Sequence, residues 1–197
     1  MKLIFATNNE NKVAEIRSIT GGKFDILTLK EAGINIDIPE PHDTLEKNAS
    51  EKSYTIYNLT QTNCFSEDTG LEVEALNGEP GVKSARYAGE HRSFEENIDK
   101  LLYNLEGSTN RRARFRTVIS LIIDGKETLF EGIAEGTITT NRRGKNGFGY
   151  DPVFVPHDSE KSFAELSMDE KNKFSHRKKA TEKLTNFLKS LEINQQK

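Results

Sequence analysis

Four short polar clusters along the chain combine residue types that could bind a phosphorylated ligand. The first follows an apolar run at residues 3–6 and consists of Thr7, Asn8, Asn9, Glu10, Asn11 and Lys12. A helical pattern begins directly afterwards, and the amino end of a helix attracts anions through its backbone N–H groups and its dipole. These residues indicate a phosphate-binding turn, although the glycines of the usual P-loop are missing. The alternative from the residues alone is an ordinary helix cap with a solvated lysine.

The second cluster is acidic and consists of Glu67, Asp68, Thr69 and Gly70. It follows the apolar segment 63–66, which we expect to be a short strand that ends there. Adjacent carboxylates at the end of a strand could bind a hard divalent cation or act as a general base. The alternative is an acidic turn on a solvated edge.

The third cluster joins aromatic rings to glycine and consists of Phe148, Gly149, Tyr150 and Asp151, with Gly147 before them. Glycine lets the backbone approach a ligand closely, and the two rings offer faces on which a nucleobase could stack. The alternative is a turn whose aromatic side chains fold into the core.

The fourth cluster is basic and consists of Lys171, His176 and Arg177. Lys and Arg suit phosphate groups, and His can donate a hydrogen bond to a carbonyl oxygen. The alternative is a basic helix start that is exposed to water. Together the four clusters supply an anion-binding turn, carboxylates for a metal, a base platform and a basic clamp. These are the parts of a nucleoside triphosphate site.

The hydrophobic pattern predicts the elements that must position these clusters. Apolar runs and alternation predict strands at residues 3–6, 24–29, 63–66, 112–123, 127–138 and 153–155. Helical spacing predicts helices after Lys12, after Asp43 or Thr44, over residues 94–105 and around residues 180–191. The pair Asp124 and Gly125 predicts a hairpin between two long strands. Early alternation of strand and helix with a late hairpin indicates an α/β protein with a mixed sheet.

Length and composition exclude several classes of protein. The 197 residues suit one domain, or two lobes sharing one core, with residues 192–197 frayed. A net charge of -3 disfavours nucleic-acid binding. The single cysteine, Cys64, permits no intrachain disulfide and no cysteine-based zinc site, and we expect a buried thiol. No segment approaches the roughly 20 apolar residues of a membrane helix, so we expect a cytoplasmic protein without membrane contact.

At these same clusters the sequence resembles the inosine triphosphate pyrophosphatase family, whose members hydrolyse non-standard purine nucleotides. The resemblance runs from Ala6 to about Ala180 and rests on six segments in the family's order. These are residues 6–12 (ATNNENK), 45–49 (LEKNA) with Lys52, 67–71 (EDTGL), 80–87 (PGVKSARY), 148–152 (FGYDP) and 175–177 (SHR). Any one segment could arise by chance, whereas six in one order are highly specific.

The resemblance implies an Mg²⁺-dependent enzyme that converts ITP, dITP and XTP to the monophosphate and pyrophosphate. Such an enzyme clears these nucleotides from the pool before they enter DNA or RNA. The family fold implies an elongated mixed sheet with flanking helices, two lobes around a central nucleotide-binding cleft, and a homodimer.

The resemblance also implies a role for individual residues. Residues 7–12 and Lys52 bind the triphosphate, Asp68 is the catalytic base and a metal ligand, and Glu40 is the second metal ligand. Asn8 stands where many relatives have glycine, and Thr69 stands where many have serine. The remaining substrate-binding positions are Phe148, Gly149, Tyr150, Asp151, Lys171, His176 and Arg177.

In this scheme Asp68 accepts a proton from the water that attacks between the α- and β-phosphates. Lys12, Lys52 and Lys171 stabilise the leaving pyrophosphate. A hydrogen-bond donor facing O6 favours a 6-oxo purine over adenine, and His176, Arg177 or a backbone N–H could supply it.

Three rival functions are a Maf-type pyrophosphatase for pyrimidine or modified nucleotides, a nucleotide sensor without turnover, and an RNA-binding module. The pair His176 and Arg177 and the loop at 148–151 disfavour the first. Asp68 disfavours the second, because a sensor needs no base. The net charge disfavours the third.

Overall fold

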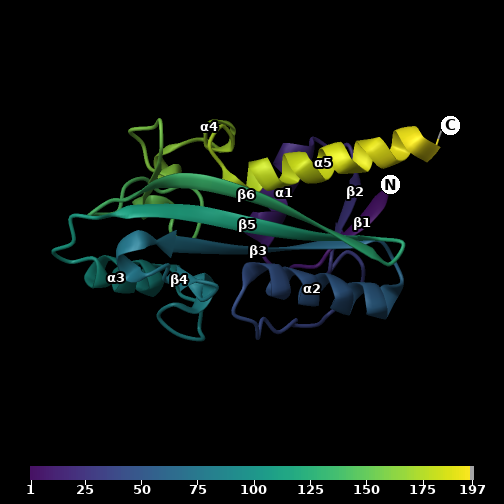
Figure 1. The fold of residues 1–197 in the computed structure, drawn as a ribbon, viewed down its shortest axis with the longest axis horizontal. Coiled ribbons are helices and arrows are strands. Elements are labelled where there is room, and N and C mark those ends of the chain that lie inside the picture. The colour runs from purple at the N-terminus through teal and green to yellow at the C-terminus, as the bar shows by residue number, and fades with distance from the viewer. Residues whose placement is uncertain (196–197) are drawn as a thin grey trace. The chain divides into compact units, whose positions relative to one another are not determined.

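The computed structural model describes residues 1–195 and shows a mixed α/β fold (Figure 1). The strands are β1 (Lys2–Phe5), β2 (Asp25–Thr28), β3 (Cys64–Val73), β4 (Pro80–Gly81), β5 (Arg112–Ile123), β6 (Lys126–Ile138) and β7 (Phe154–Pro156). The α-helices are α1 (Glu10–Thr20), α2 (Leu45–Thr60), α3 (Phe94–Asn104), α4 (Met168–Asn172) and α5 (His176–Gln195). Short 3₁₀ helices are η1 (Glu74–Leu76), η2 (Ser84–Arg86), η3 (Asp151–Val153) and η4 (Phe163–Glu165).

The strands form one mixed sheet in the order β2-β1-β3-β5-β6-β7, and β4 pairs with β3 beside this path. Strand β1 runs parallel to β2 and β3, whereas β4 and β7 run antiparallel to their neighbours. The predicted hairpin joins β5 to β6. Its turn residues Asp124 and Gly125 have φ values of 49° and 79°, as expected for a turn in which both central residues have positive φ. The predicted α/β class with a mixed sheet is confirmed.

Residue contacts divide the chain into two compact units. Unit 1 comprises Met1–Asp68, Thr117–Gly132 and Arg177–Lys197, and unit 2 comprises Thr69–Arg116 and Ile133–His176. Each unit has its own core. The single domain over residues 1–197 and the arrangement of two lobes around a cleft stay predictions.

Unit 1 has helices on both faces of its strands. In β1, Leu3 and Phe5 pack into a cluster with residues of α1 and α5, whereas Ile4 lies in a second cluster with Ile56 of α2. Figure 1 shows α5 and α2 on opposite sides of these strands. Because both faces are buried, β1 reads as an uninterrupted apolar run rather than as an alternation.

Unit 2 has one face of β5 in its core. Ala113 and Phe115 join the cluster that contains residues of α3, whereas the alternating residues Arg112 and Arg114 are exposed. This alternation of buried and exposed residues holds only in the first half of β5. From Val118 to Ile122, in unit 1, every position is buried. A change from one covered face to two accounts for the change in pattern.

Two element boundaries differ from the sequence-based expectation. Strand β3 continues through the acidic residues to Val73, so Glu67 and Asp68 lie inside a strand and not in a turn after it. Helix α5 begins at His176, earlier than expected. It continues to Gln195 across part of the tail expected to fray, and residues 196–197 lie outside the described residues.

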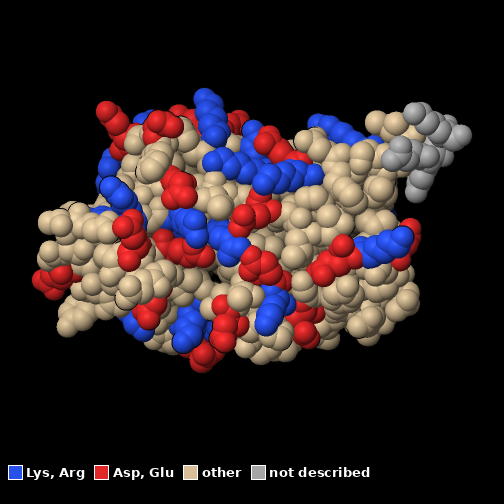
Figure 2. All heavy atoms as spheres, viewed as in Figure 1, with Lys and Arg blue, Asp and Glu red and all other residues tan. Residues whose placement is uncertain are grey.

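No helix among the described residues is both long and apolar enough to span a bilayer. On the face shown in Figure 2, Lys and Arg side chains are interspersed with Asp and Glu.

Candidate active site

The first polar cluster forms the amino end of α1. Asn9 caps this helix, because its Oδ1 accepts hydrogen bonds from the backbone N–H groups of Asn11 and Lys12 at 3.0 and 3.2 Å. Thr7 Oγ1 in turn accepts from the Asn9 N–H at 3.1 Å. The amide oxygen of Asn9 thus occupies a position that an anionic oxygen would favour at a helix start.

Lys12 is not solvated, which corrects one part of the alternative interpretation. Its Nζ lies 3.1 Å from Glu67 Oε1, and only 15% of its side chain is exposed. Glu67 also accepts two hydrogen bonds from Arg177, at 2.8 and 2.9 Å, and Arg177 pairs with Glu15 of α1 as well. Although burial raises the pKa of Glu67, Arg177 and Lys12 lower it more, so the pKa lies well below its usual range. Glu67 is therefore a fixed negative charge that holds two cations.

Asp68 points to other partners, because successive side chains of a strand face opposite sides. Lys52 of α2 reaches Asp68 Oδ1 at 3.3 Å, Glu40 Oε1 at 2.5 Å and the backbone carbonyl of Glu67 at 2.8 Å. Burial raises the pKa of Asp68; Lys52 and Lys12 oppose this and Glu40 adds to it, and the net effect is an elevated pKa. A carboxylate with an elevated pKa is a stronger base, which suits proton abstraction.

The residues around Asp68 fit a divalent cation. Its Oδ2 is buried and has no hydrogen-bond partner among the residues that the structure describes. Asp68 and Glu40 both contact Lys52, whose ammonium stands between these two carboxylates. The described residues contain no cluster of three or more His, Cys, Asp or Glu ligands. Two carboxylates suit Mg²⁺, which keeps several waters and takes further oxygens from phosphate groups.

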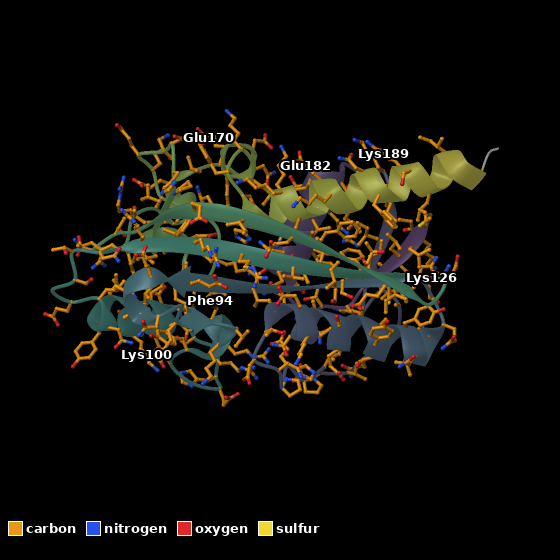
Figure 3. The ribbon with its side chains drawn as sticks, viewed as in Figure 1. Phe94, Lys100, Lys126, Glu170, Glu182 and Lys189 are labelled. Atoms are coloured by element: carbon orange, nitrogen blue, oxygen red, sulfur yellow. The ribbon has the colours of Figure 1, made fainter. Side chains whose placement is uncertain are left out.

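The third cluster, in unit 2, divides between surface and core. Phe148 is half-buried, and its ring lies 6.1 Å from that of Phe94, which is labelled at the start of α3 in Figure 3. Tyr150 is buried, and its hydroxyl donates to the Ser84 carbonyl at 2.8 Å. The core alternative therefore holds for Tyr150, whereas Phe148 stays a candidate stacking platform.

A buried ion pair supports the loop that carries Phe148. Asp151 Oδ2 accepts hydrogen bonds from Lys171 Nζ at 2.7 Å and from the Phe148 N–H at 2.9 Å. Lys171 Nζ also lies 5.4 Å from the centre of the Phe148 ring. Gly147 has a φ of 76°, and a Cβ there would lie 2.0 Å from Asp151 Oδ2. Glycine is thus required beside this carboxylate.

The fourth cluster is buried, so the interpretation as an exposed basic helix start is wrong. His176 stacks on Phe115, with ring centroids 4.7 Å apart, in unit 2. The neighbouring Arg177 belongs to unit 1, where Glu67 and Glu15 engage its guanidinium. These ion pairs give Arg177 a structural role, and its expected contact with O6 stays a prediction.

The sequence profile of the Ham1 family matches residues 3–187. The chain belongs to the Ham1 family. The resemblance found at the sequence motifs is thereby confirmed.

Members of the Ham1 family from several bacteria cover nearly all of this chain. A dITP/XTP pyrophosphatase of Flavobacterium johnsoniae is 50% identical over 188 residues, which are 95% of this chain and 98% of that relative. One from Porphyromonas gingivalis is 51% identical over 188 residues, which are 95% and 97% of the two chains. The solved Ham1 protein of Staphylococcus aureus has a TM-score of 0.87 and 39% identity, covering 96% of this chain and 99% of its own.

The sequence motifs gave no individual role to three residues that lie beside candidate residues, namely Glu15 and Asn48 in unit 1 and Phe94 in unit 2. Glu15 lies one helical turn after Lys12, a spacing that could have suggested a shared face. Asn48 lies one turn before Lys52 on α2 in the same way. Phe94 begins the helix predicted over residues 94–105, and no local signal in the sequence indicates that its ring contacts Phe148.

Proposed function

We propose that this protein hydrolyses noncanonical purine nucleoside triphosphates, namely ITP, dITP and XTP, to the monophosphate and pyrophosphate. One observation carries the chemical part of the proposal. Asp68 is a buried carboxylate with an elevated pKa and an unpartnered Oδ2, on a strand of a Ham1-family chain. The names of the relatives, dITP/XTP pyrophosphatase, support the choice of substrate. Removal of these nucleotides keeps them out of DNA and RNA.

Residues of unit 1 handle the phosphates. Asp68 accepts a proton from the water that attacks between the α- and β-phosphates. Residues 7–12 bind phosphate oxygens at the start of α1, and Lys12 and Lys52 stabilise the charge that develops on the leaving pyrophosphate. Asp68 and Glu40 would hold Mg²⁺, which would supply positive charge to neutralise the phosphates.

Residues of unit 2 handle the base. Phe148 stacks on the purine ring, and His176 or a backbone N–H presents a donor to O6. Gly149 lets the loop backbone come close to the nucleotide, and Thr69 supplies a hydroxyl. Lys171 was expected beside the pyrophosphate, but its contacts with Asp151 and Phe148 support a role beneath the base platform instead.

The resemblance also motivates the proposal of a homodimer. The composition and net charge of the sequence motivate the proposal of a cytoplasmic protein that binds neither nucleic acid nor membranes. Light scattering after size-exclusion chromatography tests the oligomeric state. A monomer at micromolar concentration would contradict the homodimer and leave the hydrolysis proposal untouched.

The deciding experiment measures pyrophosphate release from ITP, XTP, dITP, GTP and ATP, with Mg²⁺ and with EDTA. We expect ITP, XTP and dITP to exceed ATP and GTP by a large factor in kcat/KM, and all activity to vanish in EDTA. Equal rates on all five nucleotides would leave a general nucleotide pyrophosphatase. Binding of ITP without pyrophosphate release would favour the sensor.

A further inference from the structure

The loop that carries Glu40 is tethered on both sides of this residue. Before Glu40, the Asn8 side-chain amide donates a hydrogen bond to the Ile36 carbonyl at 3.0 Å. After it, His42 is held by Asn48 of α2 through two hydrogen bonds. The residues on either side of Glu40 are prolines, whose ring restricts the φ angle and stiffens the segment. The loop is therefore built to present one side chain in one place.

Asn48 makes the tether that lies closest to Glu40. Its Oδ1 accepts from the His42 N–H at 2.9 Å, and its Nδ2 donates to the His42 carbonyl at 3.0 Å. Only 1% of Asn48 is exposed, so its amide is shielded from water while His42 remains partly exposed. A buried amide that pairs with both polar groups of one residue fixes that peptide in position and in orientation.

Asn48 and Lys52 lie one helical turn apart on α2 and therefore share a face. Lys52 contacts Glu40 at 2.5 Å and Asp68 at 3.3 Å. One face of α2 thus holds the backbone of the Glu40 loop through Asn48 and the Glu40 carboxylate through Lys52. The two contacts set the separation between Glu40 and Asp68.

We propose that Asn48 is a positioning residue for the metal site, which holds the loop so that Glu40 and Asp68 meet one divalent cation. This inference rests on the proposed function, because it takes these two carboxylates as the metal ligands. Without Asn48 the loop samples more conformations, and cation binding has to order it. Residues that support metal ligands typically change metal affinity by about 10- to 100-fold when they are replaced.

Unit 2 contains a matched control. Asn97 of α3 is 2% exposed, its Oδ1 accepts from the Ala88 N–H at 2.7 Å, and its Nδ2 donates to the Ala85 carbonyl at 3.1 Å. Like Asn48, it is a buried asparagine on a helix whose side-chain amide pairs with backbone groups of another segment, although Asn97 bonds Ala88 and Ala85 rather than one residue. Its loop carries no proposed metal ligand. Asn97→Ala therefore removes an equivalent tether from a segment that is not expected to affect the metal.

The test measures Mn²⁺ binding by electron paramagnetic resonance in wild type, Glu40→Gln, Asn48→Ala and Asn97→Ala, with folding checked by circular dichroism. We expect Asn48→Ala to weaken Mn²⁺ binding by about 10- to 100-fold, and Asn97→Ala to bind as wild type does. In turnover assays, Asn48→Ala should need more Mg²⁺, and saturating Mg²⁺ should restore most of kcat. A purely structural role would lower kcat at every Mg²⁺ concentration.

Two outcomes overturn the inference in different ways. Wild-type Mn²⁺ affinity in folded Asn48→Ala would remove the positioning role and leave the metal site intact. No Mn²⁺ binding by the wild-type protein would remove the metal site itself. If Asn48→Ala does not fold, Pro41→Gly loosens the same loop from an exposed position. It should also weaken Mn²⁺ binding, and unchanged affinity in that variant would count against the proposal.

Discussion

Both units bury charged side chains, but they arrange them differently. In unit 1, Glu67 joins Lys12 and Arg177, and Lys52 joins Asp68 to Glu40, so carboxylates and cations alternate in branched groups. In unit 2 the buried pair of Lys171 and Asp151 lies against the Phe148 ring. Groups in which one charged side chain contacts two of opposite charge suit the binding of phosphate and metal, and this chemistry is the same for every nucleotide. A single neutralised pair beneath an aromatic ring suits recognition of a base.

The largest effect is expected at the base in unit 1. Asp68→Asn should lower kcat by roughly 10²–10⁴-fold, because an amide cannot accept the proton. The loss should be the same for ITP, XTP and ATP, since the chemistry of unit 1 does not depend on the purine. Steady-state kinetics on the three nucleotides check this, with circular dichroism to confirm folding. A mutant with wild-type kcat would remove Asp68 from the mechanism.

The second prediction concerns the stability of the charge network in unit 1. Arg177→Met leaves Glu67 and Glu15 buried without their shared cation, and breaking a buried pair typically costs about 3–5 kcal/mol in the free energy of unfolding. The control is Lys178→Met, one residue further along α5, whose cation pairs with Glu182 at the surface. The Lys178→Met variant should lose less than about 1 kcal/mol in the free energy of unfolding.

Urea titrations of both variants measure these differences. A small loss of stability in Arg177→Met, together with a selective loss of ITP turnover, would contradict the structural role. It would favour direct reading of O6 by the guanidinium instead.

The third prediction separates stacking from base reading in unit 2. Phe148→Ala should weaken the binding of ITP, GTP and ATP alike by about 1–3 kcal/mol, because stacking does not distinguish the bases. His176→Phe preserves an aromatic contact with Phe115 but removes the ring N–H donors, so it should lower kcat/KM for ITP and XTP more than for ATP.

Comparison of kcat/KM across the nucleotides tests both variants. Tyr103→Ala, at an exposed position of α3, is the control for loss of an aromatic side chain. If His176→Phe affects all nucleotides equally, the O6 donor lies elsewhere.

The smallest effect is a pH dependence that distinguishes the cores of the two units. Burial raises the pKa of the Cys64 thiol in unit 1 to about 12. The folded thiol therefore stays neutral above about pH 8.5, where the unfolded thiol ionises, so stability falls as pH rises by up to about 1.4 kcal/mol per pH unit. Burial also raises the pKa of the Tyr150 hydroxyl in unit 2. Because an unfolded tyrosine ionises only near pH 10, this group lowers the stability only above about pH 10.

Urea unfolding of wild type and Cys64→Ala at pH 7.5 and pH 9.5 tests this assignment. The wild type should lose more stability between the two pH values than the variant does. Equal losses would show that Cys64 does not control stability in this window.

Local pattern was enough to predict the class of the protein and most of its elements. The period of apolar residues indicated the strands and helices, because each element buries one or both faces. The Asp124 and Gly125 pair indicated the hairpin, because these residues tolerate positive φ. The residue types in the four clusters indicated phosphate, metal and base chemistry, because those preferences belong to the side chains themselves.

Only the tertiary structure decided which of these side chains act together. Glu67 and Asp68 are neighbours in sequence, yet one pairs with Arg177, 110 residues away, and the other with Lys52. That separation depends on β3 continuing through both residues, whereas the acidic residues alone suggested a turn. The sequence determines local periodicity and side-chain chemistry. Contacts between distant residues follow from how the elements pack, and the periodicity of a single segment carries no information about its distant partner.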